Sequence, residues 1–96
     1  MWIRTQNNQK LVNADQLVDI FVDKTGTKLY GVSILENRDF ILLGEYENRD
    51  VCLMILDILM CILGYEDVKW INLPLGGDVS TWLEESQKLA EKIYNR

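Results

Sequence analysis

The hydrophobic and polar positions alternate along the first 46 residues with the two-residue period of β-strands. Between residues 17 and 23, for example, Val18, Ile20 and Val22 share one face and the residues between them share the other. Short polar stretches interrupt this pattern, so we expect consecutive strands to pair as hairpins in an antiparallel meander. The predicted strands span residues 1–5, 10–13, 17–23, 28–35 and 40–46.

The pattern then changes to an almost wholly apolar run at residues 51–63. Twelve of these thirteen residues are apolar, and only Asp57 is charged. Asn48 stands where a helix N-cap is expected, and Gly64 where a C-cap is expected. The run therefore predicts a helix that lacks the polar side of an ordinary surface helix.

On a helical wheel this run divides into two apolar stripes. The first is expected to pack on the sheet, and the second needs another cover, either the last helix of the same chain, a second copy, or a last helix exchanged between copies. Asp57 is expected at an edge, where it reaches water or meets Arg49, Lys88 or Lys92. The sheet stripe is Val51, Ile55, Ile58, Leu59 and Ile62, and the second stripe is Leu53, Leu56, Met60 and Leu63.

The remaining residues predict a last strand and a final helix. Residues 68–73 are β-branched and aromatic enough to return to the sheet, and Pro74 with the pair Gly76 and Gly77 ends that segment. Asp78 or Ser80 is expected to cap a helix over residues 78–96. Its apolar side comprises Val79, Trp82, Leu83, Leu89, Ala90 and Ile93.

These elements together predict an α+β fold in a single domain over residues 1–96. We expect one antiparallel sheet of four to five strands, packed by the apolar helix, within residues 1–74, and an amphipathic C-terminal helix over 78–96. A chain of 96 residues suits one small domain.

Composition and charge exclude several classes of partner. The net charge is −5 and the ten Lys and Arg residues are scattered, which argues against direct binding of nucleic acid or of an anionic membrane. The apolar run makes a helix of about 20 Å, too short for a bilayer core of about 30 Å. Residues 1–6 do not have the pattern of a signal peptide, and two cysteines fit a reducing compartment, so we expect a cytoplasmic protein.

Few residues offer chemistry. The chain has no histidine, which removes Ser-His and Cys-His dyads and His-based zinc sites. Cys52 and Cys61 are nine residues apart, on opposite sides of a helix, so they are not expected to share a metal or a disulfide. No spacing of carboxylates selects a catalytic pair. We therefore expect no enzyme activity, no catalytic or metal-binding residues and no cofactor.

The segment 23–27, DKTGT, follows an apolar strand and resembles the phosphorylation motif of P-type ATPases in the haloacid dehalogenase superfamily. That resemblance would make Asp23 a nucleophile. It covers five residues, and the parallel sheet and distant lysine of that superfamily have no counterpart in 96 residues. The interpretation that we favour is a β-hairpin with a type I turn and a G1 bulge, in which Asp23 starts the turn and Gly26 takes the left-handed position.

The opening MWIRTQ resembles a group of small uncharacterised proteins of Gram-positive bacteria, their phages and integrated elements. These proteins begin MWIR, then Ser or Thr, then Gln. The resemblance extends through LGEY at 43–46, LDIL at 56–59 and the segment from 68 to Pro74, so it covers residues 1–74. It implies a phage or mobile-element origin and assigns no activity. The apolar helix is less polar than in that group, and residues 76–96 are additional.

The leading hypothesis is a non-catalytic interaction module that forms a homo-oligomer, in the simplest case a dimer, or binds another protein. One alternative is a ligand- or peptide-binding domain that uses an aromatic sheet face, and another is an acidic decoy of a DNA-binding protein. Interface candidates are Leu53, Leu56, Met60, Leu63 and Trp82, and binding-face candidates are Trp2, Arg4, Tyr30 and Tyr46.

Overall fold

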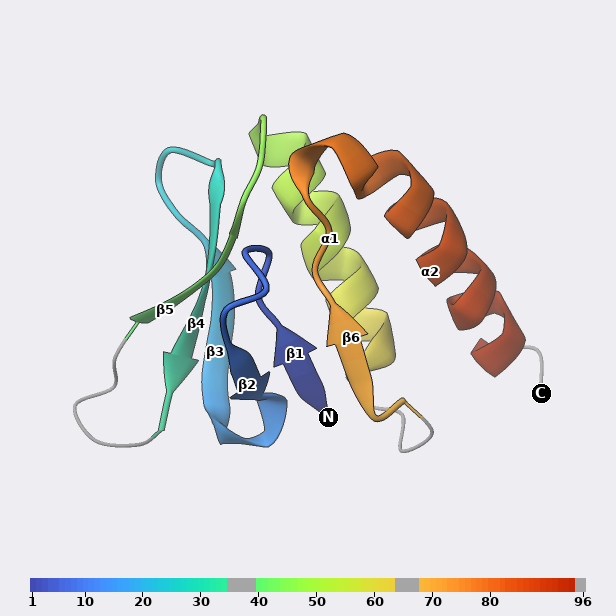
Figure 1. Cartoon of the computed structure of the whole chain (residues 1–96), viewed down its shortest axis with the longest axis horizontal. Helices are drawn as coiled ribbons and strands as arrows, with labels where there is room; N and C mark the ends of the chain where they lie inside the picture. The colour runs from blue at the N-terminus through green and yellow to red at the C-terminus, as the bar shows by residue number, and fades with distance from the viewer. Residues whose placement is uncertain (35–39, 64–67, 95–96) are drawn as a thin grey trace.

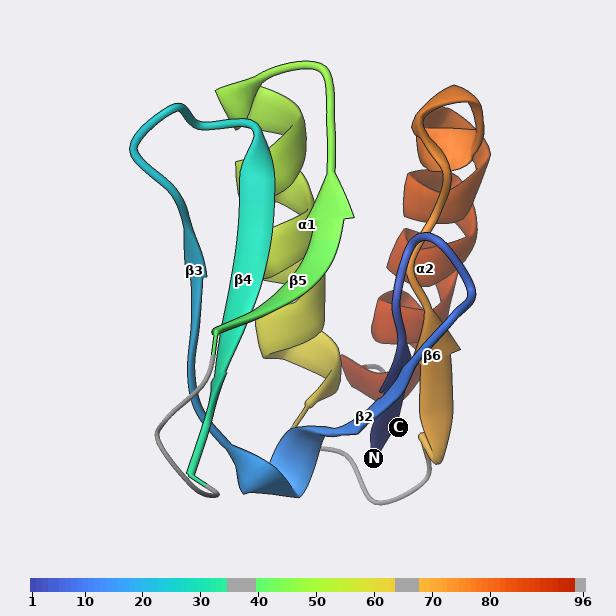
Figure 2. The same ribbon diagram turned by 60° about the vertical axis from the view of Figure 1, so that its left-hand side comes forward.

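The computed structural model describes residues 1–34, 40–63 and 68–94, without the side chains at 90, 93 and 94. Its architecture is α+β, as the sequence predicts: two small three-stranded sheets and two helices enclose one core. Figure 1 shows the sheet of β3, β4 and β5 on one side, α1 in the middle, and α2 on the far side beside β6. Figure 2 shows α1 and α2 lying side by side behind the strands.

The first sheet has the order β2-β1-β6, so the first strand of the chain lies beside the last described strand. β1 (Trp2–Arg4) pairs antiparallel with β2 (Leu11–Asn13), which confirms the predicted hairpin, and parallel with β6 (Trp70–Asn72). The middle residues of the three strands, Ile3, Val12 and Ile71, are buried and face the core. The residues on either side of them therefore face outward.

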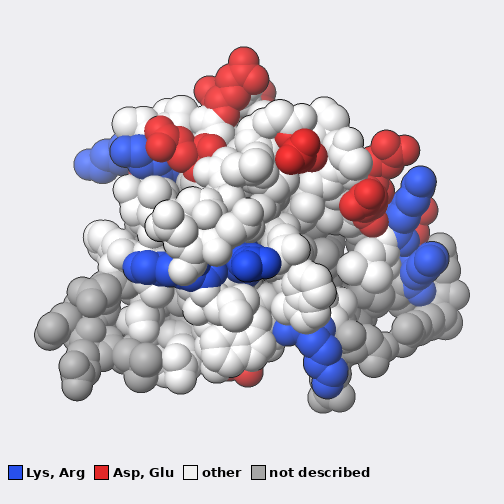
Figure 3. All heavy atoms as spheres, in the orientation of Figure 1, with Lys and Arg blue, Asp and Glu red and all other residues white. Residues whose placement is uncertain are grey.

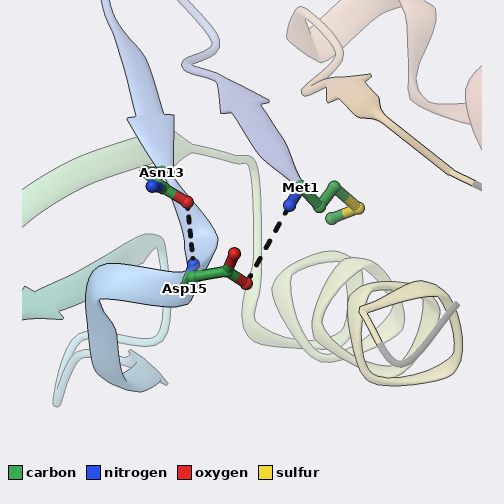
Figure 4. A network of polar contacts seen from close by, with 3 residues as sticks. All are labelled: Met1, Asn13 and Asp15. Atoms are coloured by element: carbon green, nitrogen blue, oxygen red, sulfur yellow. Dashed lines mark hydrogen bonds and ion pairs between the residues drawn. The ribbon is translucent and has the colours of Figure 1, made fainter. Parts of the chain in front are cut away.

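A short 3-10 turn, η1 (Ala14–Gln16), leads from the first sheet to the second. The side chain of Asn13 accepts a hydrogen bond from the backbone N–H of Asp15 at 3.1 Å, and the Asp15 carboxylate lies 3.9 Å from the amino group of Met1 (Figure 4). These contacts, with the bond from Ala14 N–H to Met1 C=O at 2.9 Å, fix the turn beside the start of β1.

The second sheet is a separate antiparallel meander of β3 (Leu17–Val22), β4 (Lys28–Ser33) and β5 (Phe40–Glu45). The prediction of one sheet with four to five strands is therefore wrong. The strands were expected to pair in sequence order, but the η1 turn separates β2 from β3, and β6 pairs with β1 instead of joining the meander. The predicted turn at 36–39 lies outside the described residues.

The segment 23–27 is the β3–β4 hairpin turn that we favoured. Gly26 has φ +82°, the left-handed region, and its N–H donates to the Asp23 C=O at 3.0 Å. A Cβ at Gly26 would lie 2.9 Å from Cβ of Arg49, so glycine is also required by space.

The apolar run forms α1 (Arg49–Ile62), and Asn48 caps it by accepting a hydrogen bond from the N–H of Val51 at 3.0 Å. Most of the predicted sheet stripe is buried, whereas Val51 is half-buried and Cys52 is buried in addition. Asp57 is exposed, as expected for an edge position. The predicted C-cap, Gly64, lies outside the described residues. The buried residues are Cys52, Ile55, Ile58, Leu59 and Ile62.

A second helix, α2 (Val79–Tyr94), follows the 3-10 turn η3 (Gly76–Asp78) and packs against α1 (Figure 1). Val79 and Leu83 are buried on its inner side. Trp82 is half-buried and its Nε1–H donates to the C=O of Asn72 at 2.7 Å, which fixes α2 to β6.

The residues after β5 close the core between the two sheets. Tyr46 is buried, and its hydroxyl donates to the C=O of Pro74 at 3.0 Å. Its ring lies over Gly44, where a Cβ would come within 2.7 Å of it. Gln6 also bonds to β5, with its backbone N–H donating to the C=O of Leu43 at 2.9 Å. These contacts join the two sheets into one body.

Candidate functional site

Two exposed surfaces of the described part of the chain combine apolar side chains with polar groups. We call the first the tryptophan face; it is the outer side of the β2-β1-β6 sheet. Trp2 and Trp70 occupy paired positions on β1 and β6 and are 47% and 61% exposed. Two positions further along, Arg4 lies between Leu11 on one side and Asn72 on the other. These five residues line a shallow depression of about 460 Å³.

Arg4 is the one charged residue among the five that line the tryptophan face, so this lining carries a positive charge although the chain is acidic. Arg4 is exposed, and among the described residues it has no carboxylate within ion-pair distance. Lys10 and Lys69 are exposed as well and directly precede β2 and β6, but they are not among the residues that line the depression. In Figure 3, which has the orientation of Figure 1, blue side chains cross the middle and another lies below, and further blue ones lie beside red ones at the upper left and at the right.

The second surface is a groove of about 460 Å³ between α1 and β3, which we call the β3 groove. From α1 it is lined by Leu56, Asp57, Leu59, Met60 and Leu63, and from β3 and the preceding turn by Ala14, Leu17, Val18, Asp19 and Ile20. Met60 is 72% exposed and Val18 is exposed also. β3 is an edge strand, since β4 is its only hydrogen-bonded neighbour among the described strands. The groove thus places an apolar helix stripe beside an open strand edge.

The structure brings three of the five interface candidates together. Leu56, Met60 and Leu63 line the β3 groove. Leu53 is 37% exposed outside it, and Trp82 lies on α2, bonded to β6. Although α2 packs against α1, it leaves Met60 open to solvent.

The four binding-face candidates are divided between three places. Trp2 and Arg4 belong to the tryptophan face. Tyr30 lies on the other sheet, where its ring stacks on Phe21 with centroids 5.8 Å apart. Tyr46 is buried in the core, so its side chain is not on a surface. Phe21 also contacts Phe40, and with Tyr30 these rings form an aromatic cluster on the side of the sheet opposite buried Leu29 and Leu43.

The three residues whose pKa values are shifted, Asp23, Tyr46 and Cys52, belong to a hairpin turn and to the core. The hydroxyl of Thr25 and the N–H groups of Gly26 and Lys28 donate to the Asp23 carboxylate and lower its pKa. Burial raises the pKa of the Tyr46 hydroxyl and, together with the charge of Asp23, that of the Cys52 thiol. Both cysteines are free thiols. Within the described residues no group of three or more His, Cys, Asp or Glu side chains is arranged to hold a metal ion.

Comparison with known proteins gives no assignment for this arrangement: no family model, curated protein or solved structure matches the chain. No helix among the described residues has the length and apolar character needed to cross a membrane.

Sequence reasoning missed Leu11 and Asn72 as members of the tryptophan face and did not place Trp70 beside Trp2. A signal was present, because β1 reads Trp-Ile-Arg and β6 reads Trp-Ile-Asn, each with the apolar residue between two outward positions. The alternation of a strand puts the isoleucine of each pattern on one face and its two neighbours on the other, which fits the register Trp2↔Trp70 and Ile3↔Ile71. The β3 side of the groove was missed since pairing of β3 on both sides was assumed.

Proposed function

We propose that this chain is a non-catalytic interaction module whose copies associate through the β3 groove. The observation that carries the proposal is that two features needing a partner open on the same groove. One is the stripe of Leu56, Met60 and Leu63 on α1, and the other is the free edge of β3. Strand edges are templates for pairing with another chain, and exposed apolar stripes favour burial.

A two-fold axis beside β3 satisfies both features at once. Antiparallel pairing of β3 with the β3 of a second copy makes the two meanders one six-stranded sheet, and both α1 helices then lie on the same side of it. Each helix presents its groove side chains toward the other copy. The N–H of Asp23 donates to the C=O of Lys28 on β4. Backbone N–H groups of successive strand residues point alternately to the two sides, so those of Ile20 and Val22 are directed away from β4, to the free edge.

Two acidic residues in the groove set the conditions for association. Asp19 and Asp57 are exposed and line the groove. A two-fold arrangement brings them toward their counterparts in the second copy, and like charges repel until salt screens them. The proposed dimer is therefore more stable at high ionic strength than at low ionic strength.

The test compares two charge substitutions on the same helix. We expect the wild-type chain to have the mass of a dimer by light scattering, and Met60→Glu to have the mass of a monomer with unchanged far-UV circular dichroism. Met54→Glu is the matched control, because Met54 is also exposed on α1 but does not line the groove. A folded monomer for the wild-type chain at high protein concentration and high salt contradicts the proposal, and so does dissociation by Met54→Glu alone.

The absence of catalysis and the phage or mobile-element origin are part of the same proposal and rest on the sequence. The first is supported by the lack of histidine and of a carboxylate pair, and the second by the opening residues 1–6. Turnover of any substrate by the purified chain would contradict the proposed absence of catalysis.

A further inference from the structure

The tryptophan face is a second surface, separate from the β3 groove, and its chemistry selects a different partner. The outer positions of β1, β2 and β6 bear two tryptophans, a leucine, an arginine and an asparagine within one depression. Tryptophan and arginine are the residues that most often dominate binding energy at protein interfaces. The inward positions Ile3, Val12 and Ile71 are buried in the core, whereas the outward ones that line the depression are exposed.

The charge of this face indicates an anionic group in the partner. Arg4, at the end of the central strand β1, lines the depression and has no ion-pair partner among the described residues, and no carboxylate lines the depression. The guanidinium of arginine matches a carboxylate with two parallel hydrogen bonds. Because the whole chain has a net charge of −5, the positive potential of Arg4 extends only a short distance from this side chain.

Two other occupants fit these observations less well. Packing of the tryptophan face of one copy on that of another about a two-fold axis would offer Arg4 no carboxylate, since none lines the face. A single-stranded nucleic acid would gain stacking on Trp2 and Trp70, but its repeated phosphates would be repelled by a chain whose net charge is −5.

We propose that the tryptophan face binds an acidic segment of another protein, in which a carboxylate stands next to an apolar or aromatic side chain. Arg4 pairs with the carboxylate. Trp2, Leu11 and Trp70 cover the apolar side chain, and the exposed amide of Asn72 is available to the peptide backbone. This inference is independent of association at the β3 groove.

The probe is a displayed library of random 12-residue peptides, selected on the full-length chain. We expect the selected peptides to be enriched in Asp or Glu beside Phe, Tyr, Trp or Leu. A consensus peptide should bind at least about tenfold more weakly to Arg4→Gln and to Trp70→Ser. Lys24→Gln and Leu75→Ser are the matched controls, because both residues are exposed and lie outside the face, and they should retain binding within about twofold.

A measurement on the unaltered chain removes any dependence on the folding of these variants. In a heteronuclear NMR titration with the consensus peptide, the indole N–H signals of Trp2 and Trp70 should shift, because both side chains line the face. The inference is overturned if no peptide is selected, if the selected peptides lack acidic residues, or if they bind Arg4→Gln as well as the wild-type chain. Tighter binding of a 12-nucleotide oligothymidine than of the peptide also overturns it. These readouts do not depend on the side of the molecule that bears Met60. Failure of peptide binding therefore does not contradict self-association at the β3 groove, and failure of self-association does not contradict peptide binding.

Discussion

At the scale of single residues, Asp23 shows how a motif that suggests chemistry serves a turn. Its carboxylate accepts hydrogen bonds from the Thr25 hydroxyl at 2.7 Å and from the N–H groups of Gly26 and Lys28 at 3.1 Å. A carboxylate held by three donors of its own loop closes the hairpin and keeps Gly26 in its left-handed conformation. The same residues that resemble a phosphorylation motif are thus fully explained by local backbone geometry.

These hydrogen bonds predict a pH dependence of stability. They lower the pKa of Asp23 in the folded chain below its value in the unfolded chain. The stabilisation is therefore present above the unfolded pKa and is lost as the pH falls through the folded pKa. We expect the urea midpoint of the wild-type chain to exceed that of Asp23→Asn at about pH 6 and to approach it at about pH 2.5. A difference that is constant over this range contradicts the assignment.

At the scale of elements, the beginning of α1 is well determined by sequence. Asn48 has an extended backbone, and its side chain accepts the hydrogen bond from Val51 N–H that the first turn would otherwise lack. Asp50 adds a negative charge in that turn, where the helix dipole favours it.

Removal of this cap should destabilise the chain by a definite amount. We expect Asn48→Ala to lower the free energy of unfolding by about 1 kcal/mol, and Asn48→Asp, which retains an acceptor, to lower it much less. Urea denaturation followed by circular dichroism measures both. Equal effects of the two substitutions contradict capping by the side chain.

The partner of each strand was less predictable than its position. The alternation predicts each strand to within a few residues, because burial of one face imposes the two-residue period. It does not state which strands are neighbours. β6 pairs parallel with β1, across the whole length of the meander and α1, and only the shared Trp-Ile pattern hints at it. The division into two sheets depends on this long-range pairing and on the short η1 turn.

At the scale of the whole molecule, the two sheets enclose the core from two sides and leave two unlike surfaces open. The wheel of residues 51–63 correctly predicts which side of α1 is buried, with Cys52 as an addition. It also predicts a second stripe in need of a cover, and the structure adds that three of its four residues, Leu56, Met60 and Leu63, share a groove with the edge of β3. No reasoning from local pattern supplies that juxtaposition, since it depends on how α1 lies across the sheet.

Amide hydrogen exchange at the edge of β3 tests the central claim, association of two copies through the β3 groove, most directly. In the dimer the N–H groups of Ile20 and Val22 bond to the second copy. Their exchange should therefore be slower at about 1 mM protein than at about 20 μM, or slow at both concentrations if the dimer persists at the lower one. Phe21, whose N–H is directed to β4, serves as the internal reference. In Met60→Glu the same two amides should exchange rapidly at either concentration. Rapid exchange of Ile20 and Val22 at both concentrations in the wild-type chain contradicts the account.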